Sequence, residues 1–162
     1  MKKVRLLGIC CNWSPFACYN AAGMAQMKMP DNFRLIRVMC IGRINQALIL
    51  RAFEYGADGV ILLECNDEDC RYGPGPEIGH ENVNRVRKLL HLLGIDQERL
   101  VEKSFAAHER EELVSALWDF VGKIEALGPV TEQEASAKYA SLGIADDVTD
   151  TTRIAEFPPR RK

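Results

Sequence analysis

Apolar residues in this chain gather into short runs that alternate with longer amphipathic stretches. The short runs cover residues 4–9, 33–39, 60–63 and 100–105. Runs of this length predict buried β-strands. The run 60–63 (Val-Ile-Leu-Leu) has no polar position, and this is typical of a strand covered on both faces of a parallel sheet. The pattern therefore predicts four strands within an α/β fold.

Helical patterns lie between and after these runs. Ser14, followed by proline, predicts the N-cap of a first helix, and Asn45 predicts the N-cap of a second. Apolar residues then recur at helical spacing through residues 83–93 and from about 108 to 127. Strands that alternate with helices form right-handed βαβ units. We therefore expect a Rossmann- or flavodoxin-like open sheet of about four parallel strands with flanking helices.

Two segments break the alternation. Residues 71–79 alternate glycine and proline, which predicts a stiff surface loop without helix. Beyond Gly128-Pro129 the periodicity weakens, and only a short helix near residues 131–142 is expected before an extended tail. We therefore expect an α/β domain over residues 1–129 and a C-terminal helix and tail over residues 130–162. A tail of this composition is suited to docking on a partner.

Composition narrows the function classes. The chain has 162 residues and a net charge of −2, without the basic excess expected of a nucleic-acid-binding protein. No apolar stretch approaches the roughly 20 residues that a membrane helix needs. The apolar start is too short for a signal peptide, and Arg5 interrupts it. We expect a cytoplasmic protein that neither enters membranes nor binds nucleic acid.

Cysteines follow three of the predicted strands. Cys10 and Cys11 end the first apolar run, Cys40 follows the second, Cys65 follows the third, and Cys70 comes soon after it. Parallel strands place their carboxyl ends on one edge, where open α/β sheets bind their ligands. At least four thiols should therefore converge there. In a cytoplasmic chain such thiols are metal ligands or redox groups more often than structural disulfides.

Thiol convergence alone leaves three kinds of protein open. Four thiolates can hold a [2Fe–2S] cluster or a structural zinc ion. Zinc sites usually carry closely paired cysteines, whereas these are spread over three strand ends. The third kind is a metal-free thiol–disulfide or sulfur-transfer enzyme that uses Cys65 and Cys70. An electron carrier, a zinc-stabilised assembly adaptor and a thiol enzyme all remain at this point.

Several motifs in order then favour one family. They are Cys10-Cys11-Asn12-Trp13, residues 36–43 (Ile-Arg-Val-Met-Cys-Ile-Gly-Arg), residues 56–60 (Gly-Ala-Asp-Gly-Val), Cys65-x4-Cys70-Arg71-Tyr72 and residues 125–129 (Glu-Ala-Leu-Gly-Pro). Together they resemble the delta subunit of methyl-viologen-reducing hydrogenase from about residue 4 to residue 129. This family is an iron–sulfur electron-transfer subunit of heterodisulfide-reductase-type complexes. The resemblance therefore implies one [2Fe–2S] cluster.

The resemblance also implies a ligand set, namely Cys11, Cys40, Cys65 and Cys70. The chain departs from the family at Ser14, where the usual motif Cys-Asn-Trp-Cys has its second cysteine, and at Arg71 and Ile41, which replace the usual histidine and serine. Cys10 or Cys18 would be the substitute ligand. A Ser14 oxygen suits iron less well, because iron in such clusters favours thiolate sulfur.

The resemblance further implies a subunit of a hetero-oligomer rather than a stand-alone catalyst. Its expected partner is a flavin- and iron–sulfur-containing heterodisulfide-reductase-like subunit. The expected electron donor or acceptor is a hydrogenase, a formate dehydrogenase or a similar enzyme. Family members are also found beside methylenetetrahydrofolate reductases and benzoyl-CoA reductase-type complexes in anaerobes. Whether such a complex bifurcates electrons depends on a flavin in another subunit.

Overall fold

A computed structural model describes residues 4–130 of the chain. Its centre is one sheet of four parallel strands in the order β2-β1-β3-β4. The strands are β1 (Leu6–Cys11), β2 (Phe33–Val38), β3 (Gly59–Glu64) and β4 (Leu100–Ser104). The expected α/β fold with about four parallel strands is confirmed.

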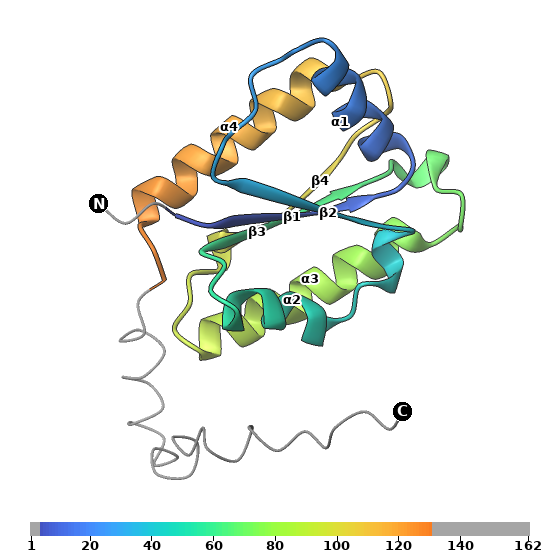
Figure 1. Ribbon diagram of the computed structural model, residues 1–162. Coiled ribbons are helices and arrows are strands. Elements are labelled where there is room, and N and C mark those ends of the chain that lie inside the picture. The colour runs from blue at the N-terminus through green and yellow to red at the C-terminus, as the bar shows by residue number, and fades with distance from the viewer. Residues whose placement is uncertain (1–3, 131–162) are drawn as a thin grey trace, which may run out of the picture.

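Helices cover both faces of the sheet (Figure 1). The helices are α1 (Ser14–Met24), α2 (Gln46–Glu54), α3 (Gly75–Leu92) and α4 (Arg110–Leu127). Short 3-10 turns η1 (Ile41–Arg43), η2 (Asp67–Asp69) and η3 (Gln97–Arg99) connect them to the strands. α1 and α4 lie together on one face, and α2 and α3 lie on the other.

None of the helices within residues 4–130 is both long enough and apolar enough to span a bilayer.

The sheet separates two apolar cores, and successive residues of a strand enter opposite ones. All six residues of β3 are buried, as expected of a strand covered on both faces. Cys10 packs with α1 and α4, whereas its neighbour Cys11 packs with the core beneath α2 and α3. This alternation decides which thiols can meet.

The helix starts only partly follow the sequence predictions. The predicted cap of α2 is confirmed, because Asn45 Oδ1 accepts a hydrogen bond from the Leu48 backbone N–H at 2.9 Å. The predicted cap of α1 is displaced by one residue, since Trp13 holds the cap position and Ser14 is the first helical residue.

The predicted stiff loop over residues 71–79 is wrong in its second half. α3 begins at Gly75, inside the Gly/Pro segment. Pro76 fits the first turn because the first backbone N–H groups of a helix have no partner within the helix, so proline's missing N–H costs nothing there. The local Gly/Pro pattern predicted a loop where packing of α3 against η1 favours a helix.

Buried hydrogen bonds of Asp58 and Arg99 connect segments at the amino ends of the strands, opposite the cysteines. Buried Asp58 accepts hydrogen bonds from the backbone N–H groups of Arg5 at 2.7 Å and Val130 at 2.9 Å. Buried Arg99 donates to the backbone oxygens of Asp58 at 3.0 Å and Gly128 at 2.7 Å. These bonds join the end of α4 to the start of β3. The segments 56–60 and 125–129, which belong to the motifs of the family resemblance, therefore have a structural role.

The predicted helix near residues 131–142 and the extended tail lie outside the described residues. The division into residues 1–129 and 130–162 stays a prediction, as does the docking role of the tail.

Candidate functional site

The first thiol pair lies at the topological switch point of the sheet. From β1 the chain crosses to β2 on one side, whereas β3 lies on the other side of β1. Open α/β sheets bind ligands at this position because the connections diverge there and leave a crevice. Cys11 is the last residue of β1 and Cys65 follows β3, and their Sγ atoms are 3.4 Å apart. The strand ends thus bring together two cysteines that are 54 residues apart in sequence.

A second thiol pair lies against the first residue of α3. Cys40, which follows β2, and Cys70, which follows η2, place their Sγ atoms side by side there. A Cβ atom at Gly75 would lie 2.6 Å from the Cys40 Sγ and 2.9 Å from the Cys70 Sγ. A Cβ atom at Gly42 would lie 2.8 Å from the Gly75 Cα. Glycine at both positions therefore lets η1 and α3 approach closely enough for both thiols to fit.

The two pairs are close enough to influence one another. Burial, with added contributions from the neighbouring Cys65 and Cys40 thiols, raises the pKa of Cys11 to about 12, against a backbone hydrogen bond from Trp13 that lowers it. Burial likewise raises the pKa of Cys40, with added contributions from Cys70 and Cys65. We call Cys11, Cys40, Cys65 and Cys70 the four-cysteine site. Only Cys70 is appreciably exposed.

The two predicted substitute ligands lie elsewhere. Cys10 and Cys18 are fully buried in the core beneath α1 and α4, on the opposite face of the sheet. Burial raises the pKa of Cys10 to about 12 and that of Cys18 to about 11. Ser14 is half-buried at the start of α1. The structure thus groups four of the six cysteines and leaves two as small core residues.

Trp13 packs against the core that contains Cys11 and Cys65, and Arg71 and Tyr72 lie beside its ring. The Arg71 guanidinium lies 4.3 Å from the centre of the Trp13 ring, and the Tyr72 ring lies 6.2 Å from it. The Trp13 Nε1 atom is buried and has no hydrogen-bond partner among the described residues. Sequence reasoning noted Trp13 only as part of a motif, and nothing in the sequence signalled the role of Gly75.

A carboxyl group lies next to the site in sequence. Glu64, the last residue of β3, has a pKa raised to about 7, first by burial and then by repulsion from Glu102 and Asp67, whereas His80 lowers it. His80 places its Nδ1 atom 2.8 Å from Glu102 Oε1.

Within residues 4–130, no group of three or more histidine, cysteine or acidic side chains has the arrangement of a ready-made site for a single metal ion. The thiols instead contact one another in two pairs. Three features fit an iron–sulfur cluster: a donor set of four thiols, a cradle that a Cβ atom at Gly75 would fill, and the unpartnered N–H of Trp13. Cluster sulfurs accept hydrogen bonds from such groups.

This fold and these thiols define a small α/β protein with a cysteine site at the carboxyl edge of its sheet. The methyl-viologen-reducing hydrogenase delta subunit family matches residues 6–128. The chain therefore belongs to the methyl-viologen-reducing hydrogenase delta subunit family, as its motifs predicted.

Two relatives match over nearly their whole length. The iron-sulfur subunit of the vhc F420-non-reducing hydrogenase from Methanococcus voltae is 39% identical over 134 residues, which cover 83% of this chain and 93% of the relative. The iron-sulfur subunit of the vhu F420-non-reducing hydrogenase from Methanocaldococcus jannaschii is 31% identical over 76% of this chain and 92% of the relative.

Another relative is much longer. This protein, from Methanosarcina mazei, is a subunit of the ferredoxin:CoB-CoM heterodisulfide reductase. It is 32% identical over 84% of this chain, which spans only 17% of its length. The same domain thus occurs on its own in hydrogenases and within a larger polypeptide in a heterodisulfide reductase. These relatives support an electron-transfer role in an oxidoreductase complex.

The burial of the thiols predicts an order of chemical reactivity. In folded, metal-free protein at pH 8, iodoacetamide should label Cys70 first, because Cys70 is the only partly exposed cysteine. Cys10 and Cys18 should react only after unfolding, because they are inaccessible and their raised pKa values keep them protonated. Peptide mapping by mass spectrometry measures each rate. Labelling of Cys10 or Cys18 as fast as Cys70 would contradict the arrangement.

Proposed function

We propose that Cys11, Cys40, Cys65 and Cys70 bind one [2Fe–2S] cluster, and that the protein relays single electrons within a hetero-oligomeric complex. The observation that carries the proposal is the grouping of these four thiols, and of no other cysteine, at the switch point. A [2Fe–2S] cluster takes four thiolates, two on each iron, so two neighbouring thiol pairs suit it. When bound, the cluster supplies a carrier for one electron.

The protein itself would hold the cluster and set its surroundings. The four cysteines would be its ligands, and Gly75 leaves space between the Cys40 and Cys70 thiols. Burial of three of the four cysteines excludes water, while Cys70 keeps the site near the surface, where a partner can approach. The Trp13 N–H is available as a hydrogen-bond donor, and Arg71 adds positive charge nearby. Hydrogen bonds, charge and exposure are the features that tune such clusters.

The proposed partners follow from the names of the relatives. These relatives belong to two kinds of complex, the F420-non-reducing hydrogenases and the heterodisulfide reductases. We propose that this chain passes electrons between a donor enzyme, such as a hydrogenase or formate dehydrogenase, and a flavin- and iron–sulfur-containing heterodisulfide-reductase-like subunit. We propose a cytoplasmic location, because a reducing compartment would keep the cysteines as thiols able to hold a cluster.

The two other interpretations have less support from the geometry. A thiol–disulfide enzyme would use Cys65 and Cys70, but the thiol that contacts Cys65 is that of Cys11, and Cys70 lies beside Cys40. A zinc-stabilised adaptor would use the same four thiols, so the metal content separates it from an electron carrier.

The proposal is tested by analysing protein purified without oxygen for iron, acid-labile sulfide and zinc. We expect about two irons and about two sulfides per chain, with a [2Fe–2S] spectrum by electron paramagnetic resonance after dithionite reduction. Zinc in place of iron would favour the adaptor. Protein that stays metal-free after anaerobic reconstitution with iron and sulfide would contradict the proposal.

Gly75→Ala tests the space between the second thiol pair. The added methyl group would lie against the Cys40 and Cys70 Sγ atoms, so cluster affinity should fall by about tenfold or more. The matched control is Gly122→Ala in α4, where a Cβ atom meets nothing within 4 Å. The control should keep its iron and gain up to about 1 kcal/mol in stability, because alanine favours helix over glycine. Equal iron contents in the two folded variants would contradict this account of Gly75.

A further inference from the structure

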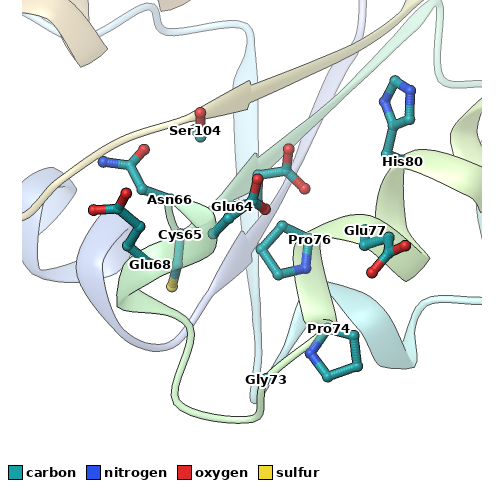
Figure 2. Close-up of a pocket in the computed structure, with 11 residues that line it drawn as sticks. Glu64, Cys65, Asn66, Glu68, Gly73, Pro74, Pro76, Glu77, His80 and Ser104 are labelled. Atoms are coloured by element: carbon teal, nitrogen blue, oxygen red, sulfur yellow. The ribbon is translucent and has the colours of Figure 1, made fainter.

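A hollow opens beside the four-cysteine site, on the side facing β4. It has a volume of about 890 Å³. Figure 2 shows it enclosed by the end of β3 and the following turn, by the start of α3, and by Ser104 at the end of β4. Cys65 lines the same hollow, so anything bound there lies next to a proposed cluster ligand.

Carboxyl groups dominate the lining. Glu64, Asp67, Glu68 and Glu77 all line this space, and we call it the acidic hollow. None of these four forms an ion pair with another residue of the described chain, as all the ion pairs there join other residues. No lysine or arginine lines the hollow. Its negative charge is therefore not neutralised by cations in residues 4–130.

His80, at the edge of the hollow, lowers the pKa of Glu64, but its ring is held by hydrogen bonds to other residues. Its Nδ1 atom is 2.8 Å from Glu102, and its Nε2 atom is 2.9 Å from the Asn84 side chain. Both ring nitrogens are therefore already engaged by other residues.

Glu64 gives a second and independent sign of an absent cation. It is only 9% exposed, and its buried Oε2 atom has no hydrogen-bond partner in the described chain. A Cβ atom at Gly79 would lie 3.3 Å from this oxygen, so a side chain there would crowd the Glu64 carboxyl group. A buried carboxylate oxygen without a donor costs free energy that an incoming donor would recover.

We propose that the acidic hollow receives an arginine side chain that projects from a partner protein of the electron-transfer complex. A guanidinium group is planar, carries five N–H donors and is more weakly hydrated than an ammonium group, so it suits a partly buried carboxylate. Charge attraction would also steer a basic partner towards this edge. The inference rests on the proposed electron-transfer function, since it fixes where a partner docks relative to Cys65.

The probe for this site is a short synthetic peptide of alternating glycine and arginine, compared with the same peptide carrying glutamine. Isothermal titration with full-length protein at pH 8, where Glu64 is mostly ionised, and at low salt should show binding of the arginine peptide alone. Glu64→Gln removes the charge at nearly constant shape and should weaken binding by about tenfold or more. Glu77→Gln, on the exposed first turn of α3, should also weaken it, and it remains informative if Glu64→Gln fails to fold.

Asp69→Asn is the matched control. Asp69 belongs to the same acidic turn as Asp67 and Glu68 but does not line the hollow. Its loss removes the same charge and should change affinity by less than about threefold, as expected of an exposed charge that does not line the hollow. Equal losses in Asp69→Asn and Glu64→Gln would mean unspecific attraction, and absence of binding would mean no site. Either result would overturn the proposal.

The chain also carries its own basic end, Arg160-Arg161-Lys162. If the peptide binds only after all three are replaced by glutamine, the occupant is this segment and the proposed partner contact is overturned. Peptide binding does not require iron. A protein that binds the peptide but holds no cluster would therefore contradict the proposed function alone, whereas a loaded protein without peptide binding would contradict this inference alone.

Discussion

The divergence of the chain at the end of β1 is the constraint on which the site depends. Because β2 lies on one side of β1 and β3 on the other, the carboxyl ends of these strands surround a crevice. Cys11 and Cys65 end two adjacent strands and therefore meet without any special loop. The parallel sheet thus positions half of the four-cysteine site through its backbone hydrogen bonds alone.

The other half depends on close packing between η1 and α3. Gly42 and Gly75 approach so closely that a side chain at either position would collide with the other segment or with the thiols. The alternation of side chains along β1 then excludes Cys10, which enters the opposite core together with Cys18. Two features of the sheet therefore determine which cysteines form the site. The strand order brings Cys11 and Cys65 together, and the alternation of faces places Cys10 in the other core. The hydrogen bonds of Asp58 and Arg99 lie at the other end of the strands, away from the cysteines.

Much of this arrangement could be predicted from the sequence, and the exceptions have physical reasons. The four apolar runs predicted parallel strands, and cysteines at their ends predicted a thiol site, because both follow from local pattern and strand direction. The start of α3 was missed because Gly73 to Pro76 favours a loop locally, whereas packing against η1 decides the outcome. The thiol pairing, the space at Gly75 and the free N–H of Trp13 arise only from tertiary contacts. The position of Cys10 outside the site could have been predicted from the sequence, because adjacent residues of a strand face opposite sides of the sheet.

The most direct test of the central claim is iron content and Mössbauer spectroscopy on alanine variants of the cysteines, after anaerobic reconstitution and a check of folding by circular dichroism. The account predicts that Cys11→Ala, Cys40→Ala, Cys65→Ala and Cys70→Ala each lose the [2Fe–2S] spectrum. The double variant Cys10→Ala/Cys18→Ala should keep it with a full complement of iron, because both residues lie in the other core. Loss of the cluster from a folded double variant, or its retention without any one of the four site cysteines, would contradict the account.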